Sequence, residues 1–105
     1  MAQFDVYENQ SKATKQAYPY ILELQSNVIS EITTRIVVPL ANYNLMKSEE
    51  LKGLTPKVNY KGTDLLILVP QIASVSTKAL KNPIGSLSHL RDEIISALDF
   101  AITGI

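Results

Sequence analysis

Apolar and polar residues alternate in short runs along the first three-quarters of the chain. Five segments show this pattern: 3–8, 18–25, 34–42, 56–69 and 73–80. A period of two predicts half-buried β-strands. The segment 56–69 predicts a hairpin, because Lys61-Gly62 interrupts it and glycine readily takes the positive φ of a tight turn. Pro39 lacks an N–H and predicts an edge strand or a bulge within 34–42.

The end of the chain has the period of an α-helix. Apolar residues three or four positions apart form one stripe: Leu87, Leu90, Ile94, Leu98, Ala101 and Ile105. Ser86 or Ser88 is expected to cap the start of this helix, and Asp92 and Glu93 fall early, where the helix dipole favours acidic side chains. Gly104 stands where a helix stops. The order is therefore several antiparallel strands followed by one terminal helix, with 43–53 as a short helical turn or an irregular loop.

The terminal helix carries more apolar residues than one buried stripe needs. Ile95 and Ile102 lie seven positions apart on a second line, and Phe100 points in a further direction. Asp99 and the chain's carboxylate fall near the negative end of the helix dipole, and no basic residue follows Arg91. A positive group on another molecule would offset that repulsion. These features predict that the C-terminal end docks onto a partner.

Composition narrows the class of protein. A chain of 105 residues with 46% hydrophobic content predicts one folded domain over residues 1–105. Ten basic and ten acidic residues cancel, which disfavours direct binding of nucleic acid. The chain has no cysteine, and its longest aliphatic run, 65–69, is too short to span a bilayer. We therefore expect a cytoplasmic protein that does not contact membranes.

No residue cluster suggests catalysis or metal binding. His89 is the only histidine and has no cluster of ligand-type residues around it in the sequence. Asp92 and Glu93 are adjacent and point in different directions on a helix, so they are poor partners for acid–base chemistry. Ser74, Ser76 and Ser88 lack the surroundings of a nucleophile. We expect a protein that is not an enzyme and that uses no cofactor and no metal.

Six short motifs, in this order, resemble the CcdB family: MAQFDVY, LELQSNVI, TRIVVPLA, IASVSTKAL, LSHLRDEI and the final TGI. The resemblance runs from Gln3 to Ile105. It implies a mainly β fold with α: a small, SH3-like, bent antiparallel β-sheet or barrel with one C-terminal α-helix. It also implies a homodimer.

The resemblance implies a function as well. CcdB proteins are toxins of plasmid and chromosomal toxin–antitoxin systems, which serve plasmid maintenance. They bind the A subunit of DNA gyrase, trap the gyrase–DNA cleavage complex, and are neutralised by a CcdA-like antitoxin. The gyrase-facing positions carried over to this chain are Ser26, Val28, Ile29, Asp99, Thr103, Gly104 and Ile105. The best-known members have tryptophan in place of Thr103 and asparagine in place of Asp99, whereas Gly104-Ile105 matches.

Two alternatives stay open. An endoribonuclease toxin of the MazF or Kid type shares this fold, but RNA cleavage needs a general base, a general acid and cationic support. The candidates for those roles are His89, Arg35, Arg91 and scattered lysines. A non-toxic, antitoxin-binding relic is the other alternative, and the departure at Thr103 keeps it open.

Overall fold

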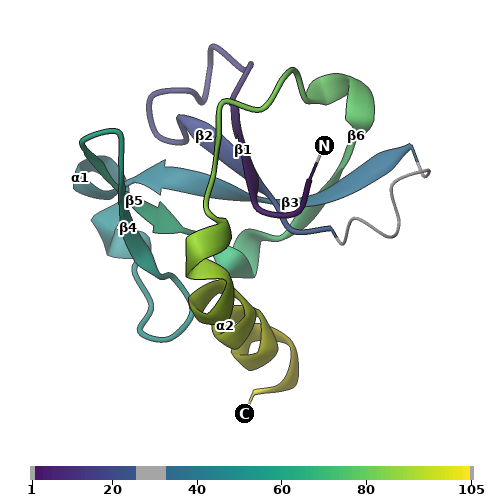
Figure 1. Ribbon diagram of the computed structural model, residues 1–105. Helices are drawn as coiled ribbons and strands as arrows, with labels where there is room; N and C mark the ends of the chain where they lie inside the picture. Colours follow the sequence, from purple (N-terminus) through teal and green to yellow (C-terminus); the bar gives the residue numbers. More distant parts are fainter. Residues whose placement is uncertain (1, 26–32, 105) are drawn as a thin grey trace.

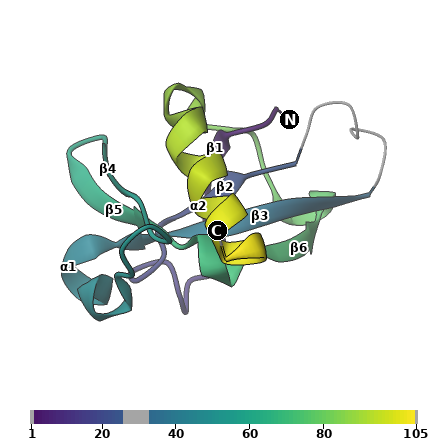
Figure 2. The same ribbon diagram turned by 90° about the horizontal axis from the view of Figure 1, so that it is seen from below.

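An antiparallel sheet curls around the main core, and one long helix packs against it (Figures 1 and 2). The computed structural model describes residues 2–25 and 33–104. The described strands are β1 (Asp5–Glu8), β2 (Tyr20–Glu23), β3 (Thr34–Asn42), β4 (Lys57–Tyr60), β5 (Thr63–Ile67), β6 (Ala73–Ser76) and β7 (Gly85–Ser86). Their order is β4-β5-β3-β2-β1-β7, with β6 also paired to β3. The terminal helix is α2 (Arg91–Thr103), and short helical segments connect several strands. The expected fold class is confirmed.

The main core lies between the sheet and α2. Val6 pairs with Leu22, and Leu22 pairs with Val38, so these three side chains form a row across β1, β2 and β3. All three are fully buried, as is Ile94 of α2 in the same apolar cluster. Side chains alternate between the two faces of a strand, which is why the period of two predicted this row correctly.

The chain between β3 and β4 folds into short helical turns. Helix α1 (Tyr43–Met46) begins where the side chain of Asn42 accepts a hydrogen bond from the Leu45 N–H at 3.2 Å. The 3-10 segment η2 (Lys47–Glu49) follows directly. Of the two alternatives expected for 43–53, the helical turn is found over 43–49. None of the helices that the structure describes could span a bilayer, because each is too short or too polar.

The hairpin of β4 and β5 forms as predicted. Tyr60 pairs with Thr63 across a two-residue turn in which Lys61 has φ 51° and Gly62 has φ 82°. Two consecutive positive φ angles define the type I′ turn, whose twist matches that of the flanking strands. Glycine takes the second position without steric cost.

Pro39 does not mark an edge strand, so the first of the two placements expected for it is wrong. Strand β3 lies inside the sheet, paired with β2 on one side and with β5 and β6 on the other. The Pro39 carbonyl accepts a hydrogen bond from the Leu68 N–H at 3.1 Å. The missing N–H of Pro39 points to that same side, where the β6 ladder ends at Val37 and the β5 ladder begins at Leu40. Proline is tolerated because it falls at the junction of two ladders.

Two predicted boundaries are also wrong. The strand expected over 73–80 ends at Ser76, whose hydroxyl accepts a hydrogen bond from the Lys78 N–H and starts a 3-10 turn, η4 (Thr77–Ala79). The helix expected from residue 87 begins at Arg91, after the 3-10 turn η5 (Ser88–Leu90). Neither Ser86 nor Ser88 caps α2. The Ser86 hydroxyl instead accepts from the Ser88 N–H, one turn earlier.

The buried face of α2 differs in part from the predicted stripe. Ile94 and Ala97 are its buried residues, and Ile95 and Leu98 pack partly buried on the same cluster. Leu90 of η5, directly before the helix, does the same. Ala101 is exposed, so its place in the core stripe was predicted wrongly. Ile95, expected on a second line, contributes to the main core.

A polar cluster is buried on the opposite face of the sheet. The Tyr7 hydroxyl donates a hydrogen bond to Glu23 Oε1 at 2.9 Å, and Arg35 Nε lies 3.2 Å from Glu23 Oε2. All three residues are less than 5% exposed. Burial and the hydrogen bond to Glu23 raise the pKa of Tyr7 well above its ordinary value, so its hydroxyl stays neutral and acts as a donor. This cluster joins β1, β2 and β3.

Tyr60 links the two ends of the curled sheet. Its ring stands edge-on to Tyr20 with centroids 5.3 Å apart, and its hydroxyl donates to the Ile84 carbonyl at 3.4 Å. Burial raises the pKa of Tyr60. A Cβ on Gly85 would overlap the Tyr60 hydroxyl and lie 3.0 Å from Cζ. Glycine at residue 85 therefore lets β4 approach β7.

The replacement Gly85→Ala should lower the free energy of unfolding by about 1–3 kcal/mol, the usual cost of overpacking a filled site. Urea denaturation followed by circular dichroism measures this change. In a Tyr60→Phe background the same replacement should cost less, because the overlapping oxygen is gone. An equal cost in both backgrounds would contradict the role given to Tyr60.

Candidate interaction surface at the end of helix α2

Helix α2 ends in a left-handed residue, as predicted. Gly104 has φ 74°, and its N–H donates to the Phe100 carbonyl at 2.9 Å. The Thr103 hydroxyl donates to the Asp99 carbonyl at 2.6 Å. Asp99, Thr103 and Gly104 are all exposed. The turn therefore presents one carboxylate and a backbone without a Cβ to solvent.

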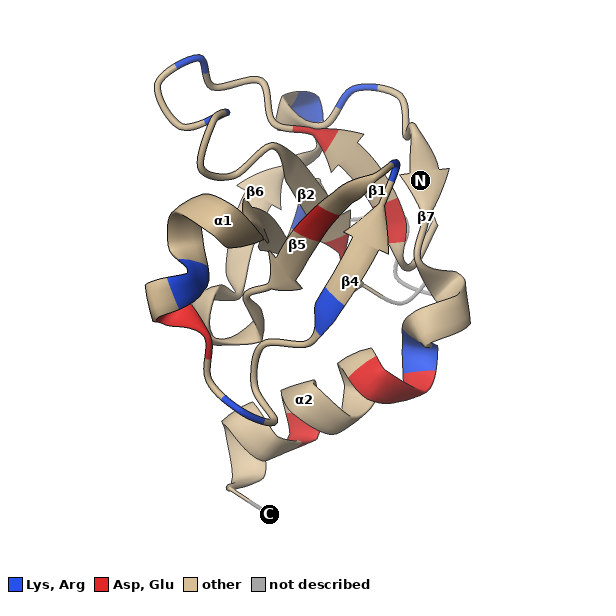
Figure 3. Cartoon of the chain, turned by 90° about the vertical axis from the view of Figure 1, so that its left-hand side faces the viewer, with Lys and Arg blue, Asp and Glu red and all other residues tan. Residues whose placement is uncertain are grey.

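The electrostatics of this turn are unfavourable for an isolated protein. The carboxylate of Asp99 lies near the negative end of the helix dipole. Among the described residues of the last turn of α2, none is basic, so no cation in this turn offsets the repulsion. In Figure 3, acidic segments (red) lie near the start and near the end of α2, and a basic segment (blue) lies beside the first of them but not beside the second. A cation from a partner would relieve this repulsion at Asp99.

Apolar side chains lie beside the helix end. Ile102 is 71% exposed, and Ile72 and Phe100 are about 40% exposed. A shallow groove of about 210 Å³ lies between the last turns of α2 and the η3 segment (Val69–Gln71). Its lining residues are Leu54, Val69, Pro70, Ile72, Leu98, Ala101 and Ile102. Exposed apolar residues that gather in one patch are typical of an interaction site.

Phe100 extends this apolar surface toward the loop before β4. A Cβ on Gly53 would lie 3.4 Å from two atoms of the Phe100 ring. The Phe100 ring thus lies against Gly53.

The structure brings three of the seven predicted site residues together: Asp99, Thr103 and Gly104, all within the last turn and cap of α2. Ser26, Val28, Ile29 and Ile105 lie outside the described residues. The sequence reading missed Leu54, Pro70 and Ile72, which come from two loops distant in sequence from α2. Their only local signal is that they are apolar residues in connecting segments, and this does not reveal which helix they approach.

Metal ligands do not cluster in the part of the chain that the structure describes: no group of three or more His, Cys, Asp or Glu could hold an ion there. His89 is exposed in the η5 turn. Arg35 is buried beside Glu23, so its guanidinium is turned into the protein. The surface at the end of α2 offers apolar side chains and a carboxylate with which a partner could interact.

Comparison with known proteins gives two findings. The family model described as CcdB protein matches residues 3–104. Among solved structures, this chain is similar to one described as an endoribonuclease in complex with its cognate antitoxin from Mycobacterial species, with a TM-score of 0.74 and 14% sequence identity. The match covers 97% of this chain and 94% of that chain. At this identity the likeness establishes a shared fold.

Proposed function

Because this chain belongs to the CcdB family, we propose that it is a toxin that binds the gyrase A subunit through the end of α2. In this proposal the toxin traps the gyrase–DNA cleavage complex and makes or breaks no bond itself. Family membership supports the general role of a toxin in a toxin–antitoxin system. The gyrase target is the specific part of the proposal.

One observation carries the proposal: the exposed last turn of α2. It combines the exposed carboxylate of Asp99 at the helix end with the open backbone at Gly104. A groove in a partner can contact the backbone at Gly104 closely, and a basic residue there can pair with Asp99. The seven carried-over positions include three in this turn.

The buried state of Arg35 favours inhibition by binding over RNA cleavage. A ribonuclease needs a cation at the phosphate and acid–base groups beside it. Arg35 pairs with Glu23 in the interior, which removes one of the two candidate arginines from the surface. The similar endoribonuclease structure shares the fold, and fold alone does not fix function.

Expression in bacteria tests the proposal. Expressed in the cytoplasm, the protein should arrest the growth of cells with wild-type gyrase. It should not affect the growth of cells whose gyrase resists CcdB toxins. Arrest of both strains would favour the endoribonuclease, and growth of both would favour the non-toxic relic. Co-expression of the cognate antitoxin, the partner that we propose by analogy with the similar complex, should restore growth in the first strain.

We also propose a homodimer formed through the apolar groove beside the helix end. Burial of Ile72 and Ile102 of each copy contributes about 1.5–3 kcal/mol per side chain before the cost of association. Analytical ultracentrifugation should show twice the chain mass of 11.6 kDa at micromolar concentration. A monomer that persists there, or a dimer unaffected by Ile102→Ser, would exclude this interface.

A further inference from the structure

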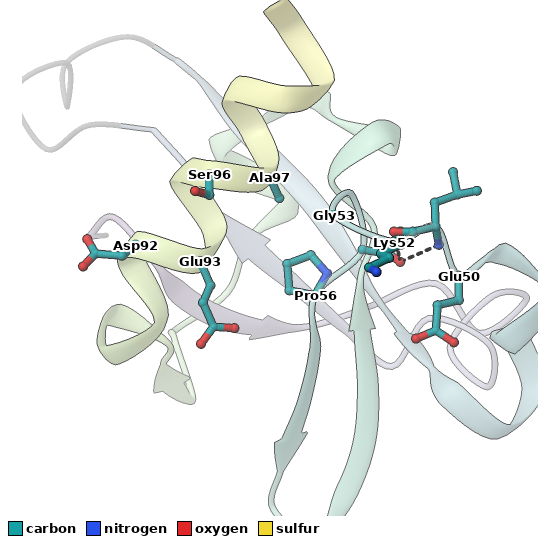
Figure 4. Close-up of a pocket in the computed structure, with 10 residues that line it drawn as sticks. Glu50, Lys52, Gly53, Pro56, Asp92, Glu93, Ser96 and Ala97 are labelled. Carbon is teal, nitrogen blue, oxygen red and sulfur yellow. Dashed lines mark hydrogen bonds between the residues drawn. The ribbon is translucent and has the colours of Figure 1, made fainter. Parts of the chain in front are cut away.

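A second groove lies on another part of α2 and takes no part in the proposed gyrase contact. It has a volume of about 580 Å³, within the usual range for binding pockets. Figure 4 shows its two walls. Helix α2 supplies one wall through Asp92, Glu93, Ser96 and Ala97, and the loop of residues 50–56 supplies the other.

The loop wall is held in one conformation by hydrogen bonds. The Leu51 N–H donates to the Thr55 hydroxyl at 2.8 Å, and that hydroxyl donates to the Leu51 carbonyl at 3.1 Å. The Leu51 carbonyl also accepts from the N–H groups of Leu54 and Thr55. Thr55 is buried. A preformed wall lowers the entropy cost of binding.

The groove is acidic although the whole chain is neutral. Its lining contains three carboxylates, on Glu50, Asp92 and Glu93, and one ammonium group, on Lys52. Asp92 is partly offset by Arg91, 3.6 Å away, and both side chains are strongly exposed. The lining therefore carries more acidic than basic side chains.

The lysine of β4 that follows the groove residue Pro56 does not line the groove. Lys57 follows Pro56 directly, yet its ammonium group lies 3.9 Å from the centre of the Tyr43 ring and 4.0 Å from Asp64. Lys57 contacts α1 and β5 and does not contribute to the lining of the groove. The Tyr43 hydroxyl lies 3.4 Å from Glu50 and leaves the charge of that carboxylate in place.

The groove also has apolar contacts to offer. Leu51 is 51% exposed at the loop wall, and Pro56 and Ala97 lie between the two charged sides. Acidic walls around apolar residues are complementary to a segment that carries both basic and aliphatic side chains. A peptide can meet both demands with neighbouring residues.

We propose that this groove binds a cationic peptide segment of a partner protein. Basic side chains of the segment pair with Glu50 and Glu93, and an aliphatic side chain packs on Leu51 and Pro56. The site is distinct from the docking end, because its α2 residues are 92–97 and the docking residues begin at Asp99. It therefore adds a second contact surface to the same helix.

Fluorescence anisotropy with a labelled peptide of lysine, leucine and alanine tests the inference. The intact protein should bind this peptide more tightly than a counterpart with glutamate at every lysine, and added salt should weaken the binding. The double replacement Glu50→Gln with Glu93→Gln should reduce affinity about tenfold, since two partly exposed ion pairs are lost. Leu51→Ser should reduce affinity as well.

Glu49→Gln provides the matched control, because Glu49 is an exposed neighbour in sequence that does not line the groove. Its affinity should equal that of the unchanged protein. Equal losses for Glu49→Gln and the double replacement would overturn the inference in favour of unspecific charge attraction. The inference would also be overturned if a second copy of the chain occupied the groove. In that case sedimentation would show a dimer for the unchanged protein and a monomer for Leu51→Ser.

Discussion

Replacing Arg35 by methionine is expected to lower the free energy of unfolding by about 3–5 kcal/mol. Arg35 Nε lies 3.2 Å from Glu23 Oε2, and both side chains are no more than 5% exposed. Without the arginine, the Glu23 carboxylate would stay charged in a buried site, where the Tyr7 hydroxyl donates to it. Urea denaturation followed by circular dichroism measures the loss.

The companion variant separates charge from packing. Adding Glu23→Gln to Arg35→Met removes the uncompensated charge and keeps an acceptor for the Tyr7 hydroxyl. This double variant should recover most of the stability that the single replacement loses. If the double variant is as unstable as Arg35→Met alone, the loss comes from packing around Arg35, and the buried ion pair is not its cause.

Local patterns in the sequence predicted the strands well because each depends on nearby residues. Alternation placed Val6, Leu22 and Val38 on one face, and Lys61-Gly62 gave the hairpin its type I′ turn. Gly104 ended α2 for a similarly local reason, its freedom to adopt a positive φ.

Features that depend on distant contacts escaped the pattern. Pro39 indicated an edge strand or a bulge, and the meeting of two ladders beside β3 explains its central position. Likewise, Glu23 and Arg35 are charged residues on a face that the pattern does not mark as buried, yet Val37 and Leu80 lie in a second core beside Tyr7 on that face. The periodicity of a strand predicts on which face of the sheet a side chain lies. It does not predict which other segments cover that face.

The candidate site was predicted in part for the same reason. Its charged turn, with Asp99, Thr103 and Gly104, is contiguous in sequence and could be assigned by position. Its apolar wall unites Pro70 and Ile72 with α2, and these segments meet only in the folded chain. The acidic groove likewise joins residues 50–56 to the first turns of α2.

Removing the carboxylate of Asp99 should weaken gyrase binding by a factor of about 30 to several thousand. This range corresponds to the roughly 2–5 kcal/mol lost when one partner of a buried charge pair is truncated. The melting temperature should change little, because Asp99 is exposed and its backbone carbonyl keeps the hydrogen bond from Thr103. Calorimetric titration against the gyrase A subunit measures the affinity.

Thr103→Trp distinguishes two roles for the neighbouring position. A large aromatic side chain at this exposed site should strengthen binding if Thr103 contacts gyrase, since buried aromatic anchors dominate interfaces. Unchanged affinity would mean that Thr103 does not contact gyrase and only stabilises the end of the helix, where its hydroxyl donates to the Asp99 carbonyl.

The most direct measurement is a titration of the gyrase A dimerisation fragment with four proteins: the unchanged toxin, Asp99→Ala, a deletion of residues 104–105, and Asp92→Ala. Asp92→Ala is the control, because it removes the same charge from the opposite end of the same helix. The proposed docking end predicts that Asp99→Ala and the deletion lose most of the affinity, whereas Asp92→Ala binds like the unchanged toxin. Equal binding by all four proteins, or no binding by the unchanged toxin, would contradict the proposal that the end of α2 docks onto gyrase.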